Sequence, residues 1–131
     1  MGEIIHEKFE SANLRANFYF DKDNGIWGII FMGSMDTEPA QELNKYLHEK
    51  CYVQRYNYII DLELLEYMSS TGIGVLSNLE NYKKEFVYFS KMHPEVEKTC
   101  KLIGIDRYWK FYEDLEDVGK YLMTLYRKCK P

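Results

Sequence analysis

Residues 57–79 read NYIIDLELLEYMSSTGIGVLSNL and join an apolar run to a segment with helical spacing. The run at 57–62 is typical of a buried strand, and residues 70–84 place apolar side chains on one face of a predicted helix. Between them lie two serines, a threonine and two glycines two positions apart. A junction of this kind can hold a phosphate, carry a nucleophile or display a hydroxyl group to another protein.

The rest of the chain alternates strands and helices around this stretch. Apolar runs rich in β-branched and aromatic residues predict further strands at 15–20, 26–33, 85–92 and 108–112. Apolar residues at helical spacing predict further helices at 36–52, 94–104 and 113–128. The first two strands flank the turn sequence Asn24-Gly25 and are expected to form a hairpin. We therefore expect an α/β fold in which a β-hairpin opens a mixed, mostly parallel sheet of four to five strands, with about four helices.

The chain is expected to form one domain with a short extension. Its 131 residues are enough to bury a substantial core. Residues 1–14 lack a strong apolar period and are predicted to be an N-terminal extension, either an arm or a short helix. Residues 15–131 contain no repeat and no linker rich in proline or glycine, so they are assigned to a single domain.

Composition argues against several classes of function. A formal net charge of −4 at pH 7 argues against a nucleic-acid binder, which needs a basic face. No apolar stretch approaches the ~20 residues of a membrane span, and the first residues lack the basic head and apolar block of a secretion signal. Cys51, Cys100 and Cys129 are far apart and, like the three histidines, show no metal-ligand spacing. We expect a cytoplasmic protein with free thiols and with neither metal nor cofactor.

The junction also lacks the residues of the common catalytic motifs. No lysine follows either glycine, as a P-loop would require, and no third glycine completes a dinucleotide fingerprint. No glycine lies two residues before either serine, so a hydrolase nucleophile elbow is absent. Asp61 has no neighbouring carboxylate with which to form a phosphoaspartate site. An enzyme is therefore not expected.

Two interpretations of the junction remain open from the residues alone. Ser69 or Ser70 can cap the helix by accepting hydrogen bonds from amides two or three residues later. Each glycine costs a helix ~1 kcal/mol relative to alanine, so Gly72 and Gly74 are expected to allow a close approach. The junction is then either a structural cap with tight packing, or a hydroxyl displayed at a helix N-terminus, where a phosphate is tolerated.

Three stretches, in the same order, resemble STAS domains, in particular the bacterial anti-sigma factor antagonists. Residues 58–76, YIIDLELLEYMSSTGIGVL, resemble the family pattern of an apolar strand followed by Met-Asp-Ser-Ser/Thr-Gly-Leu-Gly-Val. Residues 31–36, FMGSMD, are similar to the exit of the family's second strand, with Pro39, Ala40 and Leu43 following in its first helix. Residues 93–106, HPEVEKTCKLIGID, resemble the segment in which a proline opens the third helix and a glycine closes it. The resemblance covers residues 15–127 and implies the STAS fold.

The resemblance also implies a function and a site. In such proteins the unmodified domain binds a serine-kinase anti-sigma factor and frees the sigma factor. The kinase then phosphorylates a serine, the pair separates, and a PP2C-type phosphatase resets the switch. The phosphorylated position corresponds to Ser70, and Thr71 corresponds to the companion hydroxyl. The surface implied to bind the partner comprises Ser34, Asp36, Ser69, Ser70, Thr71 and Gly72.

One departure from the family pattern keeps other functions open. The family's aspartate before the phosphorylated serine is Ser69 in this chain. The missing carboxylate favours a second hypothesis, a STAS-like scaffold or sensor module that is never phosphorylated and binds another regulator constitutively. A third hypothesis is a small-molecule binder whose helix N-terminus holds an anion. An enzyme is the weakest, because no base, nucleophile and orienting group converge on any stretch.

Overall fold

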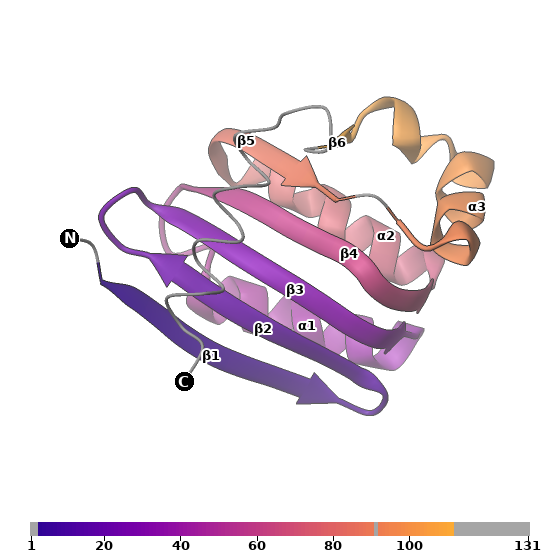
Figure 1. The fold of residues 1–131 in the computed structure, drawn as a ribbon, viewed down its shortest axis with the longest axis horizontal. Helices are drawn as coiled ribbons and strands as arrows, with labels where there is room; N and C mark the ends of the chain where they lie inside the picture. Colours follow the sequence, from indigo (N-terminus) through magenta and orange to yellow (C-terminus); the bar gives the residue numbers. More distant parts are fainter. Residues whose placement is uncertain (1–2, 91, 112–131) are drawn as a thin grey trace.

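The computed structural model describes residues 3–90 and 92–111, which form one mixed sheet with helices packed on it (Figure 1). The strands are adjacent in chain order: β1 (Ile4–Ser11), β2 (Leu14–Asp21), β3 (Ile26–Met35), β4 (Tyr56–Met68), β5 (Lys83–Phe89) and β6 (Lys110–Phe111). The β1–β2 and β2–β3 pairs are antiparallel, whereas the three later pairs are parallel. A mixed, mostly parallel sheet that contains the β2–β3 hairpin is thus present, as expected.

The helices connect the parallel strands. They are α1 (Thr37–Lys50), α2 (Ser70–Ser77) and α3 (Pro94–Ile103), with short 3-10 turns η1 (Asn78–Asn81) and η2 (Ile105–Arg107). Figure 1 shows α1 and α2 behind the sheet, so one face of the sheet is covered by both. The fourth predicted helix, at residues 113–128, lies outside the described residues.

The N-terminal residues differ from the expectation of an arm or a short helix. Residues 4–11 form β1, an edge strand paired with β2 from Ile4–Asp21 to Ser11–Leu14, so the sheet has six strands rather than four to five. The strand is also tied to α1, because Glu7 accepts hydrogen bonds from the Tyr46 hydroxyl at 2.9 Å and from Lys50 Nζ at 3.2 Å. Whether these residues are an extension to a domain that begins at residue 15 stays a prediction.

Three element boundaries also differ from the sequence expectation. The strand predicted at 57–62 runs on to Met68 as β4, past two irregularities in its pairing with β3. The helix predicted at 70–84 is α-helical only to Ser77 and continues as η1. The last predicted strand, at 108–112, begins only at Lys110 as β6, and its predicted end at residue 112 lies outside the described residues.

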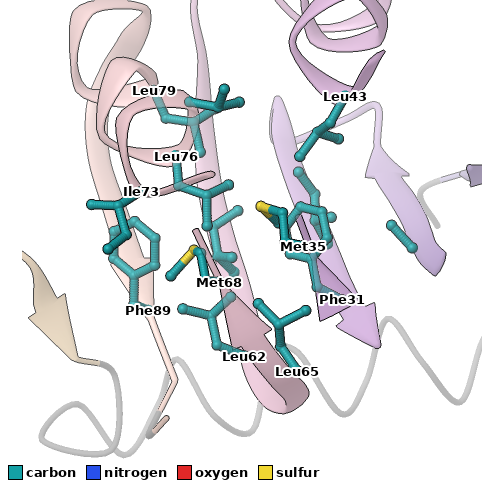
Figure 2. Close-up of a cluster of buried hydrophobic side chains, with 14 of the residues drawn as sticks. Phe31, Met35, Leu43, Leu62, Leu65, Met68, Ile73, Leu76, Leu79 and Phe89 are labelled. Carbon is teal, nitrogen blue, oxygen red and sulfur yellow. The ribbon is translucent and has the colours of Figure 1, made fainter. Parts of the chain in front are cut away.

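The core lies between the sheet and the helices that cover it. Figure 2 shows side chains of α2 packed against strand residues on one side and Leu43 of α1 near β3 on the other. The labelled members share near-complete burial and are Phe31, Met35, Leu43, Leu62, Leu65, Met68, Ile73, Leu76, Leu79 and Phe89. Burial at ~25 cal/mol per Å² of apolar surface makes this packing the main force that fixes α2 on the sheet.

Asn57 secures the start of β4 to β5. Its side chain is 6% exposed, and its Oδ1 accepts hydrogen bonds from the backbone N–H groups of Glu85 at 2.7 Å and Phe86 at 2.9 Å. The pairing of β4 with β5 is irregular between Tyr56 and Tyr58, so the side chain replaces a backbone acceptor at this point.

We expect Asn57→Ala to lower the free energy of unfolding by ~2 kcal/mol, because two part-buried N–H groups lose their acceptor. Asn57→Asp keeps an acceptor oxygen and should lose clearly less. Urea unfolding of both variants against the unmodified protein measures the difference. Equal losses in the two variants would show that the acceptor is not what stabilises this position.

Candidate functional site

The carboxyl ends of β3 and β4 lie side by side and bring two loop–helix junctions together. Met35 pairs with Met68, and the N–H of Ser69 donates to the carbonyl oxygen of Met35 at 2.9 Å. The start of α1 and the start of α2 are therefore neighbours at one edge of the sheet. Open α/β sheets commonly bind their ligands at such an edge. All six residues implied by the resemblance lie in this region: Ser34, Asp36, Ser69, Ser70, Thr71 and Gly72.

Ser69, rather than Ser70, caps α2. Its backbone is extended, at φ −72° and ψ 166°, and its Oγ accepts a hydrogen bond from the N–H of Gly72 at 3.1 Å. Its carbonyl oxygen accepts the first intrahelical bond, from the N–H of Ile73 at 3.0 Å. Only 7% of the residue is exposed, so the Ser69 hydroxyl has a structural use as the helix cap.

Ser70 is the first residue of α2, and it is exposed. Within the described part of the chain its hydroxyl has no hydrogen-bond partner, and the companion Thr71 is half-buried. The first turn of α2 carries no acidic residue. The Ser70 hydroxyl is thus accessible at a helix N-terminus whose own first turn carries no negative charge.

The exit of β3 forms the rim of this surface. Gly33 has φ +88°, and a Cβ there would lie 2.0 Å from the carbonyl oxygen of Asn13, so only glycine fits. That oxygen accepts a hydrogen bond from the N–H of Ser34 at 3.1 Å, so the β1–β2 turn borders the rim. Ser34 Oγ donates to Asp36 Oδ2 at 3.4 Å, and the exposed Asp36 carboxylate makes no cap hydrogen bond to α1.

The two glycines of α2 have different environments. A Cβ on Gly72 would lie 2.8 Å from Met35 Sδ and 2.9 Å from Met68 Cγ, so this glycine allows the helix to approach the strand ends closely. A Cβ on Gly74 would meet nothing within 4 Å. The expectation that both glycines serve close packing is therefore wrong for Gly74.

A shallow hollow of about 440 Å³ runs beside α2, and the sequence did not reveal it. It is uncharged and is lined by Asn44, Thr71, Gly74, Val75, Ser77, Asn78 and Asn81. Asparagine side chains supply both donors and acceptors. The hollow joins the N-terminal turn of α2 to α1 through residues that are far apart in the chain, so no local pattern could have predicted it.

Other reactive groups of the described chain lie away from this site or are protected. Burial raises the pKa of the Cys51 thiol, which is therefore protonated and unreactive at neutral pH. Asp61 Oδ1 accepts hydrogen bonds from the Glu63 N–H at 3.0 Å and Ser90 Oγ at 3.2 Å, which is a structural use of this carboxylate. Residues 3–90 and 92–111 contain no group of three or more histidine, cysteine or acidic side chains placed to hold a metal ion. Among the helices of these residues, none is long and apolar enough to cross a membrane.

Comparison with known proteins identifies the family. The model of the STAS domain family matches residues 20–118. The chain belongs to the STAS domain family. Ten chains of solved structures match this STAS domain, and a search of curated proteins finds no match. One of the solved structures is an anti-sigma factor antagonist from Mycobacterium paratuberculosis, with a TM-score of 0.59 and 18% sequence identity over 92% of this chain and 95% of that chain. This likeness shows a shared fold.

The two glycines of this STAS domain provide a matched pair of substitutions. We expect Gly72→Ala to lower the free energy of unfolding by ~1 kcal/mol, because the cost of overpacking against two buried methionines exceeds the gain in helix propensity. Gly74→Ala should raise it by up to ~1 kcal/mol, because only the propensity changes. Urea unfolding of both variants tests this order, and a Gly72→Ala variant as stable as Gly74→Ala would contradict the close approach.

Proposed function

We propose that this STAS domain is an anti-sigma factor antagonist. It binds a serine-kinase anti-sigma factor through the first turn of α2, phosphorylation of Ser70 by that kinase separates the pair, and a PP2C-type phosphatase restores binding. The observation that carries the proposal is the contrast between two adjacent serines: Ser69 is buried and caps the helix, whereas Ser70 is exposed. The solved structure that shares this fold is that of an anti-sigma factor antagonist, which agrees with this role.

The geometry supports a switch that acts at the interface. A phosphate adds a charge of about −1.5 to −2, which a helix N-terminus tolerates. Residues 23–44 and 56–82, which form both junctions, contain no lysine, arginine or histidine that could pair with it. The two junctions therefore supply no cation of their own for the phosphate, and covering such an unpaired charge in an interface costs ~2–5 kcal/mol. That cost corresponds to about a 30-fold to several-thousand-fold loss of affinity.

A second candidate function is a STAS scaffold that binds another regulator constitutively. It is favoured by Ser69, which occupies the position of the family's aspartate and caps α2 without placing a carboxylate beside Ser70. A kinase that reads that carboxylate would not modify this chain. The two candidates use the same surface and differ in the partner and in whether Ser70 is phosphorylated.

Incubation with ATP and the purified serine-kinase anti-sigma factor of the same organism should add the mass of one phosphate to the intact protein. Ser70→Ala should abolish the added mass, whereas Thr71→Ala should retain it. Ser69→Asp keeps a capping oxygen, restores the family carboxylate and should not slow the reaction. If only Ser69→Asp is phosphorylated, the unmodified chain is the constitutive scaffold.

The effect of the charge can be separated from the effect of side-chain size. We expect Ser70→Asp to weaken binding of the same anti-sigma factor by at least about 30-fold, because it places an unpaired carboxylate in the interface. Ser70→Asn is nearly isosteric with aspartate but uncharged, so it should bind close to the unmodified protein. Calorimetric titration gives both affinities. Equal weakening by the two variants would indicate steric exclusion rather than a charge-operated switch.

A further inference from the structure

The last part of β4 is bent by irregular pairing next to the candidate site. Leu65 lies opposite Gly33 and Tyr67 lies opposite Ser34, so Glu66 is an extra residue without a partner on β3. Such a bulge changes the direction in which the following side chains point, and bulges are common beside functional sites. β4 therefore presents a different set of side chains here from the one a regular strand would present.

The bulge places Leu64 and Tyr67 on the same face of the sheet. Leu64 lies opposite Met32, and Tyr67 lies opposite Ser34. Their partners are two residues apart on β3 and therefore share a face. That face is opposite α1 and α2, because the alternate residues of β3, Phe31 and Met35, are buried in the core beneath those helices.

Leu64 and Tyr67 are exposed at 57% and 45%. A single exposed apolar residue is ordinary and needs no explanation. Here, however, two of them continue the surface that contains Ser34, Asp36 and the start of α2. Tyrosine is enriched among the residues that contribute most to binding energy at protein interfaces. We call the surface formed by Met32, Leu64, Glu66 and Tyr67 the strand-end patch.

The strand-end patch is acidic at the end that borders the exits of β3 and β4. Asp36 and Glu66 are exposed there, and within residues 3–90 and 92–111 neither of them takes part in an ion pair. The β3–α1 and β4–α2 segments themselves supply no basic residue. The exposed Arg15 borders the patch on its other side, because it lies opposite Met32 on β2, across β3 from Leu64.

We infer that the strand-end patch is a second contact zone for the protein partner, and that the partner covers Tyr67 and Leu64 with an apolar cleft bordered by basic side chains. This inference rests on the proposed function, because it assigns the chemistry of the partner's surface at the same site. A second copy of this chain is a poorer occupant, because a symmetric contact would bring the same acidic groups together. The complex should therefore bury apolar surface at Tyr67 and also weaken as salt screens its charges.

The test compares two variants of the patch with two exposed controls elsewhere. Tyr67→Thr removes the ring but keeps a strand-forming residue, and Glu66→Lys reverses a charge at the bulge. Tyr108→Thr removes a ring at the exposed residue that follows η2. Glu49→Lys reverses a charge at an exposed position on α1. Binding to the purified serine-kinase anti-sigma factor of the same organism is measured by titration between about 0.05 and 0.5 M salt. Urea unfolding confirms that all four variants are folded.

We expect Tyr67→Thr to weaken binding by about 10- to 100-fold at every salt concentration. Glu66→Lys should weaken it by about 10-fold at low salt and less at high salt, because it acts through charge. Both controls should bind like the unmodified protein. The inference is overturned if the patch variants also bind like the unmodified protein while Ser70→Asp does not, and the proposed function then stands.

Two further outcomes of these experiments lead to different conclusions. If the unmodified protein binds no anti-sigma factor, the proposed function fails and the strand-end patch loses its assigned partner with it. If the unmodified protein is a dimer by sedimentation and Tyr67→Thr is a monomer, the patch is an interface between copies, and the inference is wrong.

Discussion

The close approach of α2 to the ends of β3 and β4 determines the geometry of the whole site. Gly72 faces Met35 and Met68 with no room for a Cβ, and the N–H of Ser69 is bonded to the carbonyl oxygen of Met35. Together these contacts hold the N-terminus of α2 against the strand ends. The exits of two parallel strands then form one surface, although 33 positions separate Asp36 from Ser69 in the chain.

The helices and strands whose limits depend on the local sequence pattern could be predicted from the sequence. Pro94 and Gly104 mark the ends of α3, and Gly104 indeed ends it at φ +85°. What could not be predicted depends on pairing between distant segments. β1 contains few apolar residues, and it is a strand because its backbone pairs with β2 and its Glu7 and Phe9 meet Tyr46 of α1. The strand-end patch was missed for the same reason, since the bulge at Glu66 exists only in the register between β3 and β4.

Gly72 and Gly74 were given the same role from the sequence, although helical geometry distinguishes them. They look alike in the pattern, and both were expected to allow close packing. An α-helix turns by ~100° per residue, so positions two apart point in nearly opposite directions. If Gly72 faces the core, Gly74 must face away from it, and the structure places it on the wall of the hollow between α1 and α2. Helical geometry alone could have shown that only one of the two glycines faces the core, but not which one.

The same periodicity explains how a charge at Ser70 can act without loosening the fold. The hydroxyl that caps α2 belongs to Ser69, and the residues that pack it belong to the face of Gly72, Ile73 and Leu76. Ser70 contributes to neither, so a negative group there adds favourable interaction with the helix N-terminus and removes no buried contact. The cost of that group arises only when another protein must cover it. A switch built in this way requires no conformational change in the STAS domain, and its sensitivity is set by how completely the partner excludes water around one side chain.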